Sequence, residues 1–65
     1  MIKPTPHQLD LLSLLAGGLT GKEAGVRLGI SEHTVKHLLT CVRGKLGAET
    51  STQAVAICLR KGWIK

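Results

Sequence analysis

Residues 29–40 read GISEHTVKHLLT, and this stretch decides the fold. Gly29 permits a tight turn, and the Ser31 hydroxyl can cap the following helix by accepting a hydrogen bond from its first turn. Apolar residues then recur at the i, i+3, i+4, i+7 spacing that marks one buried side of a helix. They are Val35, Leu38, Leu39, Val42 and Leu46. The spacing predicts a helix over residues 32–46 that ends before Gly47.

The opposite side of this predicted helix is polar. At about 100° per residue, the positions facing away from the apolar stripe are His33, His37, Thr40 and Gly44. Lys36 and Cys41 fall on the flanks of that polar side. We therefore expect an outer face that carries hydrogen-bonding groups and a cation.

Three further helices are predicted, over residues 6–16, 21–28 and 51–61. Thr5 can cap the first helix, with Pro6 at a position where its missing N–H costs nothing. Thr20 and Glu23 have the spacing of a capping box at the start of the second, and Thr50 can cap the fourth. No alternating strand pattern is present. The predicted fold class is all-α, a compact four-helix domain made by residues 1–65.

Two of these helices meet in a helix-turn-helix. The turn over residues 29–31 joins residues 21–28 to residues 32–46. Ala24 and Gly25 are small where two helices must cross closely, and Leu28 and Ile30 fill the angle between them. In a basic domain, the second of such helices fits the major groove of DNA, where each base pair shows a distinct pattern of donors and acceptors.

The composition of the chain limits the classes of partner that it can bind. The chain has 65 residues and a net charge of +5, from nine Lys and Arg against four Asp and Glu. This excess favours a polyanionic partner, either nucleic acid or an acidic membrane surface. No apolar run approaches the roughly 18 residues of a membrane span, and the first residues, MIKPTPHQ, lack the apolar segment of a signal peptide. We expect a cytoplasmic protein without a membrane partner, in which Cys41 and Cys58 are reduced thiols.

The segment LLSLLAGGLTGKEAGVRLGISEHTVKHLLTCVRGKLGAETSTQAV, residues 11–55, followed by GWI at residues 62–64, resembles a known family. It is similar to the LuxR/FixJ-type (GerE-like) helix-turn-helix, the four-helix DNA-binding domain at the C-terminus of many bacterial transcription regulators. The resemblance runs from about Thr5 to Ile64. Its most specific motifs are Lys22-Glu23, Ile30-Ser31, Thr34-Val35-Lys36, Lys45-Leu46-Gly47 and Ala54-Val55.

The resemblance implies residue roles. The residues expected to face base edges are Lys36, His37, Thr40 and His33. Those expected to hold DNA phosphates are Lys22, Thr34, Arg43 and Lys45. The fourth helix of such domains commonly pairs two copies on a two-fold DNA site. The predicted helix over residues 51–61 also shows more apolar surface than one edge of a small bundle needs. We therefore expect a weak homodimer through Ala54, Ile57, Cys58 and Lys61, and we expect no cofactor.

The chain departs from the family at several positions. The family's Arg-Glu near the start of the first helix is His7-Gln8, and its arginine after the third helix is Ser51. If those family charges form an internal ion pair, both ends are missing here together, which leaves neither charge uncompensated. The family's Ile-Ala after Lys-Glu is Ala24-Gly25, and its histidine after Thr-Val-Lys-x is Leu38.

Other interpretations of single residues have less support. His33, His37 and Cys41 recur at i, i+4 and i+8, a spacing that could place three zinc-type ligands on one side of a helix. One helix seldom closes a tetrahedral site and no fourth ligand is evident, so we expect no metal. Cys41 and His37 lack the acidic partner of a nucleophilic triad, so we expect no enzyme. The lone aromatic residue, Trp63, is expected to cover the core.

The predicted function is sequence-selective binding of double-stranded DNA by a transcription regulator. If Met1 is the natural start, the chain lacks the receiver or ligand-sensing domain that the family carries, and we expect a regulator without a sensor domain. The other interpretation is that the chain is a domain excised from a longer protein. The alternative is a small interaction protein, an anti-activator that docks on full-length LuxR-type regulators and silences them. Retention of Lys22, Thr34 and Lys36 favours DNA binding, whereas the missing sensory half favours the alternative.

Overall fold

The computed structural model describes residues 1–65, which form four helices and no strand. The helices are α1 (Pro6–Ala16), α2 (Gly21–Leu28), α3 (Glu32–Leu46) and α4 (Ser51–Arg60). The first three have the predicted bounds, and α4 ends at Arg60, with Lys61 as its C-cap. The predicted all-α fold class is confirmed. None of the helices has the length and apolar character needed to cross a membrane.

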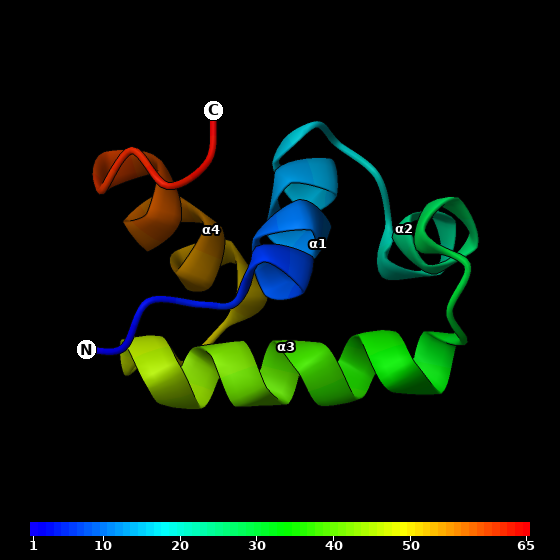
Figure 1. Cartoon of the computed structure of the whole chain (residues 1–65), viewed down its shortest axis with the longest axis horizontal. Helices are drawn as coiled ribbons and strands as arrows, with labels where there is room; N and C mark the ends of the chain where they lie inside the picture. The colour runs from blue at the N-terminus through cyan, green and yellow to red at the C-terminus, as the bar shows by residue number, and fades with distance from the viewer.

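The other three helices all pack against α3. Figure 1 shows α3 along one side of the molecule, with α2 near its first residues and α4 near its last. α1 lies between α2 and α4 and contacts both, and α3 contacts all three other helices. One side of α3 is therefore covered by the rest of the chain.

Each helix begins at a side-chain cap. The hydroxyls of Thr5, Thr20, Ser31 and Thr50 each accept a hydrogen bond from the backbone N–H three residues later. At α2 the cap is reciprocal, because the Thr20 N–H donates to Glu23 Oε1 at 2.8 Å. This backbone hydrogen bond, together with the Thr20 side chain, holds the pKa of the Glu23 carboxyl below its usual value. The capping signals in the sequence are thus confirmed.

The core consists of two adjoining clusters. The larger contains Leu12, Val42, Leu46, Ala54, Cys58 and Ile64. The smaller contains Leu11, Ala24 and Val35. Partly buried Leu15 and Leu39 pack against both clusters. The predicted stripe of α3 faces inward, since its residues are all buried or half-buried.

The C-terminal end of the chain packs on the larger cluster, and the N-terminal end contacts Trp63 and α3. Trp63 packs against this cluster, as expected, and Lys3 Nζ lies 5.8 Å from the centroid of its ring, within range of a cation–π contact. The Ile2 N–H donates to the Lys45 carbonyl at 2.9 Å, which holds the N-terminus beside the last turn of α3 (Figure 1).

The helix-turn-helix depends on two glycines. Gly29 ends α2 with φ of +72°, in the left-handed region that glycine adopts at little cost. Gly25 lies where the turn returns against α2, and the Ile30 N–H donates to its carbonyl at 2.9 Å. A Cβ on Gly25 would lie 3.0 Å from the Ile30 carbonyl oxygen and 3.1 Å from Val35 Cγ2. The absence of a side chain at Gly25 is therefore what lets α2, the turn and α3 approach so closely.

Two helical glycines provide a matched test of this packing. A Cβ on Gly44 in α3 would meet nothing within 4 Å, so Gly44→Gln should raise the free energy of unfolding by about 0.5 kcal/mol through helix propensity. Gly25→Gln should lower it by about 2 kcal/mol or more, because the new side chain enters a filled crossing. Chemical denaturation followed by circular dichroism measures both changes. Equal effects at the two positions would contradict the close crossing.

Candidate nucleic-acid interface

The outward side of α3 carries the polar residues that the sequence places there. His33, Lys36, His37 and Thr40 are all exposed, as is Gly44. The opposite side is closed by Val35 and Val42, whose side chains are almost completely buried. Because the buried stripe fixes the rotation of the helix, these four polar side chains share one accessible face. We call this set, His33, Lys36, His37 and Thr40, the α3 outer face.

Two residues expected to hold phosphates lie at the edges of the helix-turn-helix. Lys22 is the second residue of α2, and its side chain is exposed. Thr34 is half-buried in the first turn of α3, where its N–H donates to Ser31 Oγ at 3.1 Å and its hydroxyl lies 2.9 Å from the same oxygen. Both positions lie near a helix N-terminus, whose free backbone N–H groups favour anions.

The Arg43 side chain donates hydrogen bonds within the domain. Its Nη1 donates to the Glu49 carbonyl at 3.3 Å, and its Nη2 donates to Thr40 Oγ1 at 3.4 Å. Its Nε is buried without a partner, and the residue as a whole is half-buried. The guanidinium thus joins α3 to the segment that leads into α4. Its role as a phosphate ligand stays a prediction.

The Lys45 side chain also donates a hydrogen bond within the domain. Its Nζ donates to Gln8 Oε1 at 2.8 Å, and the same oxygen accepts the Thr5 N–H at 3.0 Å. Gln8 is buried, so it serves as a neutral acceptor for a cation from the last turn of α3. No sequence pattern predicted this contact, although the departure from the family at His7-Gln8 marked the place. Ser51, which stands where the family has an arginine after the third helix, lies elsewhere, in a groove between α1 and α4.

His37 and Cys41 form a pair along α3. Cys41 Sγ lies 3.8 Å from His37 Nε2, and Cys41 is half-buried. No group of three or more His, Cys, Asp or Glu side chains is placed to hold a metal ion. The structure therefore brings together two of the three residues considered as zinc ligands, without a metal-binding arrangement.

The expected dimer residues of α4 differ in accessibility. Ala54 and Cys58 have exposed fractions of 0%, so in this fold neither side chain can touch a second copy. Burial also raises the pKa of the Cys58 thiol. Ile57 is half-buried and Lys61 is exposed, and both line a surface hollow of about 320 Å³. The predicted interface stays a prediction, for which only Ile57 and Lys61 of the four residues are accessible in this fold.

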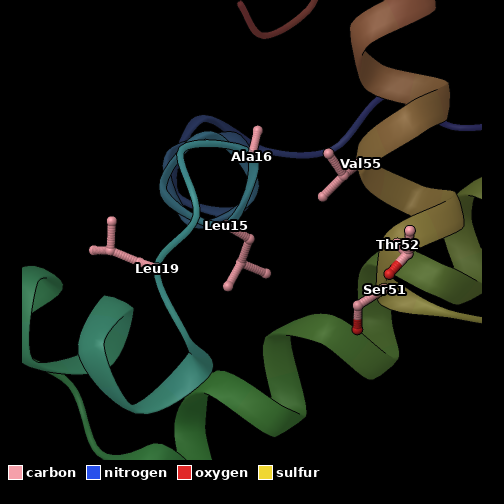
Figure 2. Close-up of a pocket in the computed structure, with 6 residues that line it drawn as sticks. All are labelled: Leu15, Ala16, Leu19, Ser51, Thr52 and Val55. Carbon is pink, nitrogen blue, oxygen red and sulfur yellow. The ribbon is translucent and has the colours of Figure 1, made fainter.

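The groove between α1 and α4 is uncharged. Figure 2 shows its lining, which comes from the end of α1, the following loop and the first turns of α4, with no residue from α3. The lining residues are Leu15, Ala16, Leu19, Ser51, Thr52 and Val55, around about 360 Å³. This groove therefore offers no cation to a nucleic acid.

The geometry defines a helix-turn-helix domain with an exposed polar second helix. Residues 5–58 match the model of the bacterial regulatory proteins, luxR family. The chain belongs to this family. Its fold is similar to a solved structure described as that of the transcription factor GerE, with a TM-score of 0.89 and 30% sequence identity, over 94% of this chain and 91% of that one.

Curated relatives show the same similarity in sequence. The transcriptional regulatory protein YdfI of Bacillus subtilis is 43% identical over 89% of this chain and 27% of its own length. The HTH-type transcriptional activator RamA of Corynebacterium glutamicum is 42% identical over 92% of this chain and 21% of its length. The DNA-binding transcriptional activator DevR/DosR of Mycobacterium tuberculosis is 42% identical over 77% of this chain and 23% of its length. The chain thus spans about a quarter of the length of these relatives.

The two cysteines should differ in reactivity. Iodoacetamide should alkylate Cys41 faster than Cys58 by roughly tenfold or more, because reaction at a buried thiol requires local opening. The raised pKa of Cys58 further reduces its reactive thiolate. Timed labelling and peptide mass spectrometry measure both rates, which should converge in denaturant. Equal rates in the folded chain would show that α4 does not bury Cys58.

Proposed function

We propose that this chain binds double-stranded DNA sequence-selectively, as the DNA-binding part of a transcription regulator. The observation that carries the proposal is the α3 outer face, four polar side chains on a helix whose other side is locked into the core. Family membership supports it, and relatives such as RamA and DevR/DosR are described as transcriptional activators. The net charge of +5 suits a polyanion.

The proposed contacts separate into two kinds. Lys22 and Thr34 hold phosphates, which supply affinity and position the domain on the duplex. The α3 outer face reads base edges in the major groove, which supplies selectivity. Lys36 can reach the N7 and O6 acceptors of a guanine, because its ammonium carries three donors. Such a protein acts where the bacterial chromosome lies, in the cytoplasm.

We propose a weak homodimer as the DNA-bound form. Ile57 offers a half-buried apolar side chain on α4, and the neighbouring Arg60 and Lys61 line the same hollow. The positive charges of two copies repel each other near such an interface, which keeps association weak without DNA. Two adjacent half-sites would hold two copies together. No feature of the structure favours the alternative role as an anti-activator, and we do not propose it.

Lys22 and Lys36 test the division between affinity and selectivity. Lys22→Ala should weaken binding to all duplexes alike and reduce the log–log salt slope by about one, since one phosphate contact is lost. Lys36→Ala should cost about 1–3 kcal/mol on the preferred site and much less on other sequences. Fluorescence anisotropy on a selected site and on a scrambled duplex, at one fixed salt concentration, measures both affinities, and a salt titration gives the slope.

Circular dichroism of each lysine variant provides the folding control. If both substitutions lower both affinities by the same factor, the α3 outer face does not read bases through Lys36. If the wild-type chain binds no duplex at any salt concentration, the proposed function is wrong.

Ile57 and Leu59 form a matched pair for the proposed dimer. Ile57→Lys should reduce assembly of two copies on a duplex with a two-fold site by about tenfold, because it places a like charge at the proposed interface. Leu59 is exposed on another side of α4, so Leu59→Lys should leave the assembly intact while adding the same charge. Sedimentation velocity gives the stoichiometry. One copy per duplex for the wild-type chain would exclude this interface.

A further inference from the structure

The Thr40 hydroxyl has a restricted set of hydrogen bonds left for DNA. Thr40 belongs to the exposed α3 outer face, so a base edge can approach it. A hydroxyl has one donor hydrogen and two acceptor lone pairs, and in water it can offer either kind. The contacts of Thr40 inside the domain decide which kind remains.

The donor hydrogen of Thr40 is already in use. Its Oγ1 lies 3.0 Å from the Lys36 backbone carbonyl, one helical turn earlier. A carbonyl oxygen can only accept, so Thr40 must be the donor in this contact. Such bonds to the carbonyl four residues back are common for threonine in helices.

Arg43 occupies one of the two lone pairs. Its Nη2 donates to Thr40 Oγ1 at 3.4 Å, and a guanidinium has no acceptor with which to receive a hydrogen in return. The hydroxyl hydrogen therefore cannot turn toward Arg43. The guanidinium is itself held by the Glu49 carbonyl at 3.3 Å and by burial of Nε, which limits its freedom to swing away.

We propose that Thr40 presents only one acceptor lone pair to DNA, and thereby selects a base with an amino group in the major groove, adenine or cytosine, over guanine. Adenine and cytosine show an amino donor there, at N6 and N4, and either donor matches this lone pair. The guanine edge shows only acceptors, which oppose the remaining lone pair. Arg43 contributes by occupying the second lone pair, while the Lys36 carbonyl takes the hydrogen. This inference rests on the proposed function.

Selection of bound sites from a random duplex pool tests the inference. For the wild-type chain, one position in each half-site should be enriched for adenine or cytosine over guanine, read on the contacted strand, by about three- to tenfold, the discrimination expected of one hydrogen bond. Thr40→Val keeps the shape but removes the hydroxyl, and should flatten the enrichment at that position alone. Thr40→Ser keeps the hydroxyl contacts, and should retain the rejection of guanine there.

Arg43→Met tests whether the Lys36 carbonyl alone directs the hydroxyl. It removes the donor to Thr40, but the hydroxyl hydrogen still donates to the Lys36 carbonyl, so guanine should still be rejected at the same position. Arg27→Met removes the same charge from an exposed site on α2 and should leave the base preference unchanged. Helical circular dichroism confirms that each variant is folded. Acceptance of guanine by Arg43→Met, with the preference of Arg27→Met unchanged, would show that the Lys36 carbonyl does not hold the hydroxyl hydrogen, and that result would overturn the proposal.

The two possible failures have different signatures. If the wild-type chain selects a defined motif in which the position altered by Thr40→Val is guanine, the inference is wrong and the proposed function stands. The inference is equally wrong, and the function again stands, if a motif is selected but no position in it responds to Thr40→Val. If no duplex is selected at all, both are wrong.

Discussion

The structure depends on the burial of one side of α3. Val35, Val42 and Leu46 are almost fully removed from solvent, and they bring α3 into contact with all three other helices. Val35 belongs to one core cluster, while Val42 and Leu46 belong to the other, so a single helix ties both clusters together. Rotation of α3 would expose apolar surface in both clusters, which a domain of this size cannot tolerate. The direction in which the α3 outer face points is therefore fixed by the core.

The packing of α3 also engages two of its positively charged side chains in contacts within the domain. The chain carries nine Lys and Arg, yet two of those on α3, Arg43 and Lys45, donate hydrogen bonds within the domain. Lys45 finds a neutral amide acceptor in Gln8, which avoids the desolvation of a second charge. Net charge alone thus overstates the number of cations that are free to meet a polyanion. In this fold, the exposed Lys22 and Lys36 are better placed for that role.

The departures from the family pattern are accommodated by local packing. Ala24 is fully buried in the smaller cluster, and Gly25 lets the turn pass at van der Waals distance. Leu38 is half-buried and packs against the same cluster. Gln8 keeps a partner on α3 through Lys45. Small residues at the crossing and a neutral acceptor at the start of α1 are consistent with the retained fold.

The sequence by itself determined the four helices and the side of α3 that faces outward. Caps such as Thr20 with Glu23 act within three residues, and the stripe of α3 repeats within one helix, so both can be read locally. Only the tertiary structure decided which side of α4 is buried, because that helix is apolar on nearly all sides and its pattern does not distinguish Cys58 from Ile57. It also decided that Lys45 meets Gln8, since 37 residues separate them and no local rule pairs residues at that distance.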